Sequence, residues 1–321
     1  MTAKLITRRR ALVILAATTA LPGSLCAAQG QPFEWRGLAL GADARLVLWA
    51  QDKRHAQTAI DACIAEIERL EQIFSLYRRS SEISRLNRTG AIKAPSHDMV
   101  SLLHLSRKMN AATQGLFDPT VQPLWEFLSN WYSANPNRIA PSQEDMAAVR
   151  SLLGMEKITL DNGLVACNDG ARITLNGIAQ GYITDRVAEL LRSKGWRHVL
   201  IDLGEVRALD TKADGSAWRI DIRETEQRHQ LAHAALATSS GGTLTFDHSG
   251  AATHILNPLT GRSPTSWRAV TVQHPSAAIA DALSTALFAA SPEQLKKIAN
   301  IHNGSHIWAM HTDGTNFEYG A

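Results

Sequence analysis

One acidic residue within an otherwise apolar segment gives the first indication of chemistry. Between Ser276 and Phe288 the sequence reads SAAIADALSTALF, which predicts a helix that is apolar on nearly every side and therefore buried. A lone carboxylate is costly there, so Asp281 requires a cation or several hydrogen bonds. Thr285 lies four residues further on, on the same helical face. This oxygen pair suits Mg²⁺, and the alternative is an Asp hydrogen-bonded within a core.

Two further segments combine glycine with polar side chains. In TLNGIAQGYITD, residues 174–185, Gly177 and Gly181 fall at the start of a predicted helix, where free N–H groups favour a phosphate. In GLFDPT, residues 115–120, the proline holds Asp118 in an extended conformation, so that a ring and an acceptor oxygen are available to a ligand. Taken singly, the first segment is equally well explained as an ordinary helix cap and the second as a turn.

Two loops complete the set of segments that could carry chemistry. Residues 237–242 read ATSSGG, and residues 254–261 read HILNPLTG, which places His254 before a turn. A lone histidine is usually structural. The chain contains no dinucleotide-binding glycine fingerprint, phosphate-binding P-loop, zinc-protease HExxH motif or nucleophile elbow. Any chemistry must therefore use another arrangement.

Hydrophobic patterns predict the scaffold that positions these segments. Apolar residues at spacings of three and four predict helices over residues 53–74, 97–112, 178–194 and 276–290. Strands are predicted over 198–203, 218–223, 233–238, 269–273 and 306–311, with a hairpin over 158–172. Residues 130–142, rich in proline and asparagine, predict a surface loop. Because strands and helices do not alternate regularly, we predict an α+β fold rather than a doubly wound parallel sheet.

The first 28 residues differ from the rest of the chain. Lys4 and Arg8–Arg10 precede an apolar run over residues 11–20, which is shorter than the roughly 20 residues a bilayer requires. We therefore predict a cleaved secretory signal rather than a permanent membrane anchor. The paired arginines fit the twin-arginine pattern of folded-protein export, which predicts a periplasmic protein. The predicted division is a signal peptide over 1–28 and a catalytic domain over 29–321.

Without the signal peptide, the charge no longer favours polyanionic partners. The remaining chain has 29 basic and 30 acidic residues, a net charge of −1. No basic stripe is left to follow a phosphate backbone, so we expect no nucleic-acid partner. Cys63 and Cys167 lack metal-like spacing, and the sequence leaves open whether they form a disulfide or remain free thiols.

Taken together, the order and spacing of these segments resemble the motifs of ApbE-type FAD:protein FMN transferases. The resemblance runs from about Leu38 to Phe288 and also includes FSLY at residues 74–77 and SEISRLN at 81–87. It implies an α+β fold of duplicated T-fold-like sheets packed with helices, in a single catalytic unit. It also implies that the protein uses FAD and Mg²⁺.

The resemblance assigns roles to individual residues. The side chains of Asp281 and Thr285, with the backbone carbonyls of Gly177 and Ser284, correspond to the Mg²⁺ ligands of the family. His254 corresponds to the catalytic histidine. The positions that line the FAD site are Leu40, Tyr77, Leu116, Phe117, Asp118, Thr174 and Gln180.

The implied reaction is a phosphoryl transfer. Mg²⁺ neutralises the pyrophosphate of FAD, and His254 takes a proton from a Thr or Ser hydroxyl of the acceptor. AMP leaves, and FMN stays on the acceptor as a phosphoester. The implied acceptor is a periplasm-facing flavoprotein with a Ser/Asp-Gly-Ala-Thr-like segment.

Four positions depart from the family pattern. Thr174 stands for an acidic residue, Gln180 for a lysine, Glu205 for one of two paired glycines, and Asn257 for the acid before a proline. Together with the twin-arginine signal, these departures resemble the NosX-like branch associated with nitrous-oxide reductase. The acceptor there is the NosR-type membrane flavoprotein of that system.

Three other functions remain open at this stage. A FAD pyrophosphatase would use water in place of the acceptor hydroxyl and yield FMN and AMP. A non-catalytic accessory protein would bind FAD without turnover because of the departures at Thr174, Gln180 and Glu205. A periplasmic binding module for another small ligand would not require a buried Asp and Thr one helical turn apart. The sequence also leaves the oligomeric state open.

Overall fold

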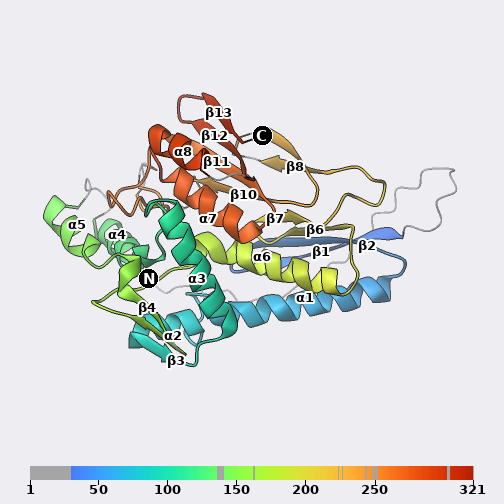
Figure 1. Ribbon diagram of the computed structural model, residues 1–321, viewed down its shortest axis with the longest axis horizontal. Coiled ribbons are helices and arrows are strands. Elements are labelled where there is room, and N and C mark those ends of the chain that lie inside the picture. Colours follow the sequence, from blue (N-terminus) through green and yellow to red (C-terminus); the bar gives the residue numbers. More distant parts are fainter. Residues whose placement is uncertain are drawn as a thin grey trace.

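An eight-stranded antiparallel sheet forms the centre of the protein (Figure 1). The computed structural model describes residues 30–135, 141–161, 163–222, 224–225, 227–242, 244–247, 250, 252–301 and 304–320. In spatial order the strands are β1 (Gln31–Ala39), β2 (Ala42–Ala50), β6 (Val199–Asp202), β7 (Val206–Ala208), β10 (Ala235–Ser240), β11 (Trp267–His274), β12 (His306–His311) and β13 (Asn316–Tyr319).

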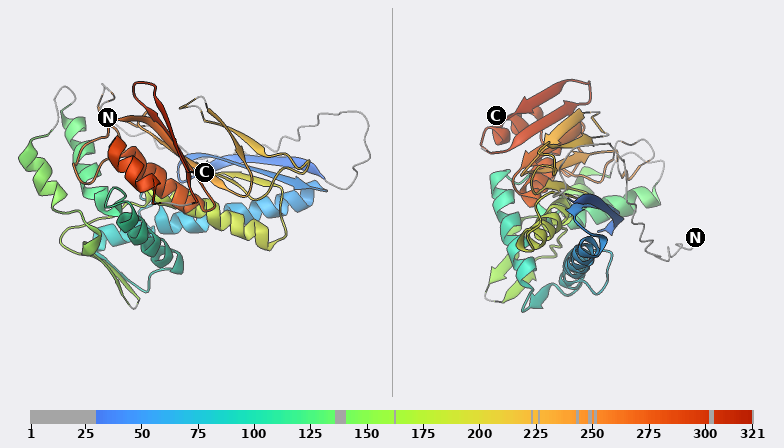
Figure 2. Two further views of the ribbon diagram at one scale, coloured as in Figure 1. Left: turned by 45° about the horizontal axis from the view of Figure 1, so that its top comes forward. Right: turned by 90° about the vertical axis from the view of Figure 1, so that its right-hand side faces the viewer.

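Helices cover one face of this sheet. Figure 2 shows α1 (Lys53–Phe74), α6 (Asn176–Ser193) and α7 (Ala277–Phe288) along that face. The apolar stripe of α1 is buried against β1 and β2, while α7 packs between α6 and strands β10 and β11. Ten of the twelve residues of α7 are buried, including Asp281. The predicted burial of this acid is therefore confirmed.

The other elements flank this core. Helix α3 (His97–Ala112) packs on α1, α6 and α7. A hairpin, β8 (Trp218–Ile222) and β9 (Gln227–Leu231), covers part of the opposite sheet face through a small apolar cluster. The remaining described elements are α2 (Glu82–Thr89), β3 (Ala91–Lys93), α4 (Gln122–Ala134), α5 (Gln143–Arg150), β4 (Ile158–Asp161), β5 (Leu164–Cys167) and α8 (Pro292–Ala299).

Most of the sequence predictions for the fold are confirmed. The class is α+β, and the four predicted helices are present within two residues of their expected ends. The hairpin predicted over 158–172 is also present, but its second strand ends at residue 167. The predicted loop over 130–142 is wrong for residues 130–134, which belong to α4. That helix is held by apolar packing, since Trp125 and Tyr132 both contact the ring of Phe246.

The sequence also raised expectations about a signal peptide and about the pairing of two cysteines. The predicted signal peptide, residues 1–28, lies outside the described residues. In the part of the chain that the structure describes, no helix is both long enough and apolar enough to cross a bilayer. Cys63, buried in α1, and Cys167, at the end of β5, are both free thiols.

Candidate functional site

Helices α6 and α7 approach each other closely where the predicted cation site lies. The N–H of Gly181 donates a hydrogen bond to Oδ2 of Asp281, at 3.0 Å. A Cβ at position 181 would lie 2.3 Å from the carbonyl oxygen of Ala277, so glycine is required for this approach. The glycine-rich segment therefore brings a backbone donor from one helix to the buried acid of the other.

Asp281 has little else to stabilise its charge. Its exposed fraction is 4%, and burial raises the pKa of its carboxyl group to about 7. The hydrogen bond from Gly181 opposes this rise, and the negative charge of Asp185 adds to it. Among the described residues, no basic side chain forms an ion pair with Asp281. A bound cation would remove the cost of keeping this group ionised.

Hydroxyl groups surround the same point. Ser239 in β10 places its Oγ 2.9 Å from Oγ of Ser284 and 3.5 Å from Oγ1 of Thr285. Gly177 lies against Thr285, since a Cβ at position 177 would be 3.0 Å from Oγ1 of Thr285. The backbone at Gly177 leaves the helical conformation, with φ −88° and ψ 18°. The structure therefore brings together the four predicted cation-binding residues.

The chemistry of this cluster fits Mg²⁺. Its donors are carboxylate, hydroxyl and carbonyl oxygens, which hard cations prefer. Among the described residues, no three His, Cys, Asp or Glu side chains gather as a metal-binding group. A cation here would therefore depend on hydroxyl and backbone oxygens as well as carboxylate.

His254 lies in a turn that is attached to the end of α7. Asn257, three residues on, donates from Nδ2 to the carbonyl oxygen of Ala289 at 2.8 Å. Its Oδ1 accepts from the N–H groups of Leu259 and Thr260, at 2.9 and 3.1 Å, which closes the turn. With asparagine in place of an acid, this corner carries no charge, and the side-chain amide of Asn257 forms hydrogen bonds through both its nitrogen and its oxygen.

The imidazole of His254 is in the state that a general base needs. Its Nδ1 lies 3.0 Å from the carbonyl oxygen of Leu244, which only accepts, so Nδ1 carries the proton. The other ring nitrogen, Nε2, then has a free lone pair. Burial lowers the pKa of His254, and the hydrogen bond to Leu244 opposes this effect. The ring is therefore neutral at pH 7 and able to accept a proton.

The buried acid Glu71 contacts the backbone of Leu40 and the side chain of Arg78, which follows Tyr77 in the sequence. Glu71 accepts a hydrogen bond from the N–H of Leu40 at 2.8 Å and pairs with the guanidinium of Arg78. Leu40 has a positive φ of 48°, which is unusual for a side chain with a Cβ. The adjacent Tyr77 is 78% exposed, so its ring is available to a ligand.

The other predicted FAD-site residues are less accessible. Leu116 and Phe117 are buried in the core, so the structure does not present the Phe117 ring at a surface. The carboxylate of Asp118 accepts from the N–H and Oγ1 of Thr120, at 2.8 and 2.6 Å. The N–H of Thr174 donates to the carbonyl oxygen of Pro119 at 2.8 Å, which joins the two segments.

Gln180 occupies the position where the family pattern has a lysine. Its side-chain amide lies against Gly204, where a Cβ would be 2.6 Å from Nε2 of Gln180. The half-buried amide therefore faces the turn between β6 and β7, next to Glu205.

Sequence reasoning assigned no role to three residues that organise this region. Ser239 belongs to the hydroxyl-rich segment but has no individual signature. Glu71 reads as one more acid on an amphipathic helix. Asp185 accepts from Oγ of Ser276 and the N–H groups of Ala277 and Ala278, at 2.7, 2.9 and 3.1 Å. It thereby caps α7 from another helix, and only the fold reveals this contact.

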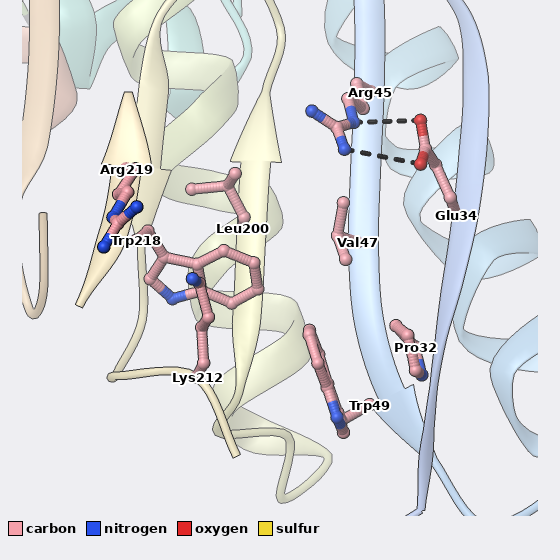
Figure 3. Close-up of a pocket in the computed structure, with 9 residues that line it drawn as sticks. All are labelled: Pro32, Glu34, Arg45, Val47, Trp49, Leu200, Lys212, Trp218 and Arg219. Carbon is pink, nitrogen blue, oxygen red and sulfur yellow. Dashed lines mark hydrogen bonds and ion pairs between the residues drawn. The ribbon is translucent and has the colours of Figure 1, made fainter. Parts of the chain in front are cut away.

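A hollow of about 320 Å³ lies elsewhere, at the outer face of the sheet (Figure 3). Val47, Trp49 and Trp218 line it, and Arg45 at its rim forms two hydrogen bonds with Glu34. None of the predicted site residues lines this hollow. The candidate site is therefore defined by the contacts between its residues.

Comparison with known proteins finds relatives along most of this chain. The FAD:protein FMN transferase of Vibrio cholerae is 29% identical over 282 residues, covering 84% of this chain and 83% of that protein. The FAD:protein FMN transferase of Escherichia coli K12 is 26% identical over 301 residues, covering 88% and 83%.

Solved structures show the same fold. The apo form of the Pseudomonas stutzeri flavinyl transferase ApbE has a TM-score of 0.78 and 27% identity, covering 91% of this chain and 96% of that one. The ApbE protein of Thermotoga maritima has a TM-score of 0.80 and 26% identity, covering 90% and 97%. Residues 40–308 match the model of the ApbE family, and the chain therefore belongs to that family.

Proposed function

We propose that this chain is a magnesium-dependent FAD:protein FMN transferase, which moves FMN from FAD onto a Thr or Ser of another protein and releases AMP. Membership of the ApbE family and the names of its relatives support the activity. The observation that carries the mechanism is the attachment of two functional groups to one helix. Asp281 lies within α7, and the turn that bears His254 is bonded to the end of α7.

The cation site would be formed by the side chains of Asp281 and Thr285 with the carbonyl oxygens of Gly177 and Ser284. Mg²⁺ bound there would neutralise charge on the pyrophosphate of FAD. The N–H of Gly181 holds Oδ2 of Asp281 in place, and Ser239 orients the hydroxyls of Ser284 and Thr285.

His254 would act as the general base. Its Nε2 accepts the proton of the acceptor hydroxyl, while Nδ1 continues to donate to the carbonyl oxygen of Leu244. The hydroxyl oxygen forms a bond to the phosphorus atom of the FMN moiety, and the bond from that phosphorus to the oxygen of AMP breaks. The products are a phosphoester on the acceptor and AMP.

FAD would extend from this point over the other predicted binding residues. The exposed ring of Tyr77 offers a flat apolar face, and Leu40 would lie at the near edge of the site. Leu116 and Phe117 would support the site from beneath, because their side chains are buried. Asp118, Thr174 and Gln180 supply polar atoms around it. Gln180 and Thr174 are both uncharged, so the two departures cancel in net charge.

The cellular setting is part of the proposal. The twin-arginine pattern in residues 1–28 supports export to the periplasm, and the pattern of departures supports the NosX-like branch. The acceptor would then be a NosR-type flavoprotein, or another periplasm-facing protein with a Ser/Asp-Gly-Ala-Thr-like segment.

Intact-mass measurement of an acceptor domain tests this function. The domain, carrying such a segment, is incubated with the chain, FAD and Mg²⁺, and AMP is assayed in parallel. A flavinylated acceptor with matching AMP, both abolished by EDTA, is the expected result. AMP with free FMN would instead identify a pyrophosphatase. Bound FAD without either product, on several acceptor domains, would identify an accessory protein.

A further inference from the structure

Glu205 is a buried acid that the proposed mechanism does not use. It lies in the turn between β6 and β7 with 7% of its surface exposed. Its Oε2 is fully buried and has no hydrogen-bond partner among the residues that the structure describes. The backbone N–H of Thr238 is near the same carboxyl group and lowers its pKa. An acceptor oxygen in this state requires a partner.

Two neighbours of Glu205, Thr238 and Gly204, are next to residues that surround Asp281. On one side, Thr238 is followed by Ser239, whose hydroxyl contacts those of Ser284 and Thr285. On the other side, Gly204 lies against Gln180, which precedes the Gly181 N–H bonded to Asp281. Burial is the main cause that raises the pKa of Glu205, followed by the negative charge of Asp281 and then that of Asp202. The charge of Asp281 therefore acts on the carboxyl group of Glu205.

Two neighbouring buried carboxylates cannot both stay ionised without a positive charge. A proton on one of them removes part of the free-energy cost of burying two negative charges side by side. A divalent cation between them removes more of that cost. Arg207, in the next strand, pairs with Asp185. No Lys, Arg or His among the described residues forms an ion pair with Glu205 or Asp281. Two carboxylates and neighbouring hydroxyls form a donor set that matches the charge and hardness of a divalent cation.

We propose that Glu205 supplies a second carboxylate, through Oε2, to the cation site of Asp281, so that this chain binds its divalent cation with two acidic side chains. The inference rests on the cation site of the proposed function. It has one consequence that the proposed function does not require. A site with two carboxylates binds its cation before FAD arrives, because the protein itself supplies the balancing negative charge.

The test is cation binding without FAD. The chain is stripped with EDTA, dialysed at pH 8, and titrated with Mn²⁺, with free Mn²⁺ followed by electron paramagnetic resonance. Titration calorimetry repeats the measurement with Mg²⁺. The variants are Glu205→Gln, Asp281→Asn and, as a matched control, Glu82→Gln. Glu82 is also a buried acid, but its carboxylate accepts from the N–H of Ser96, the N-cap residue of α3.

We expect the wild-type chain to bind one divalent cation in this assay. Glu205→Gln should weaken binding by at least the ~10–100-fold that loss of even an outer-shell partner costs. Asp281→Asn should weaken it as much or more, and Glu82→Gln should leave it unchanged. Wild-type affinity in Glu205→Gln would overturn the proposal. So would the absence of cation binding by the wild type without FAD. Mg²⁺-dependent AMP release in that last case would leave the transferase function intact.

Thermal unfolding supplies a second readout. In EDTA at pH 8, Glu205→Gln should raise the unfolding temperature, because the amide avoids the free-energy cost of keeping a buried acid either protonated or ionised at that pH. With saturating Mg²⁺, the same variant should gain less stability than the wild type does. A residue with a purely structural role would lower the unfolding temperature under both conditions, and that result would contradict the proposal.

Discussion

Replacement of Asp281 by asparagine should stabilise the cation-free protein at neutral and alkaline pH. The pKa of Asp281 is about 7 in the folded chain, against an ordinary value of 3.8. Because the folded pKa is the higher one, ionisation of this group opposes folding. A difference of about three pKa units corresponds to about 4 kcal/mol above pH 7, and asparagine avoids this cost. The asparagine side-chain oxygen can still accept the hydrogen bond from Gly181.

The sign of the pH dependence makes the prediction specific. Below the unfolded pKa, the acid is protonated in both states and costs nothing. As the pH rises through the interval between the two pKa values, the wild type loses stability relative to Asp281→Asn. From pH 5 to pH 8 the advantage of the variant should grow by about 3 kcal/mol. Above pH 8 it should stay constant.

Urea unfolding of both proteins in EDTA, at pH 5 and pH 8, measures these free energies. Saturating Mg²⁺ should reverse the order at pH 8, since only the wild type gains the full binding free energy of the cation. A variant that is less stable than the wild type in EDTA at pH 8 would refute the reasoning. That result would mean that the ionised carboxylate already has a favourable partner in the folded chain.

Three further predictions concern the other functional groups. His254→Ala should retain FAD and cation binding but lose at least about 100-fold in transfer rate. The wild-type rate should fall only below the ordinary histidine pKa of 6.5, when Nε2 becomes protonated. Asp185→Ala removes the cap of α7, so it should lower the free energy of unfolding, measured with urea, by about 1–2 kcal/mol and also weaken cation binding. Asp185→Asn should keep part of the stability and part of the cation affinity. Tyr77→Ala should change stability by less than about 0.5 kcal/mol, because the ring is exposed, yet weaken FAD binding measured by flavin fluorescence. Unchanged transfer in His254→Ala, unchanged cation affinity in Asp185→Ala or unchanged FAD affinity in Tyr77→Ala would each disprove the role assigned.

Local patterns in the sequence determined most of the individual elements. The periodicity of apolar residues is a property of a short segment, so α1, α3, α6 and α7 were predictable within a few residues. The loop predicted over residues 130–142 was wrong for residues 130–134, because tertiary contacts of α4 with Phe246 outweigh the loop-like composition. Residues 136–140 lie outside the described residues. The hairpin of β1 and β2 was also missed. Strand β2 pairs with β6, which lies far along the sequence, and both strands pack on α1, which follows β2 directly.

For the site, the sequence alone determined which residues needed partners, and only the tertiary structure decided what those partners are. Asp281 is identifiable as a buried acid because its neighbours within one helix are apolar. The donor that it finds is Gly181, one hundred positions away, and the acid whose pKa its negative charge raises is Glu205. Neither contact leaves a local pattern. They arise because the packing of α6 on α7 and the order of strands β6, β7 and β10 bring distant segments to one point.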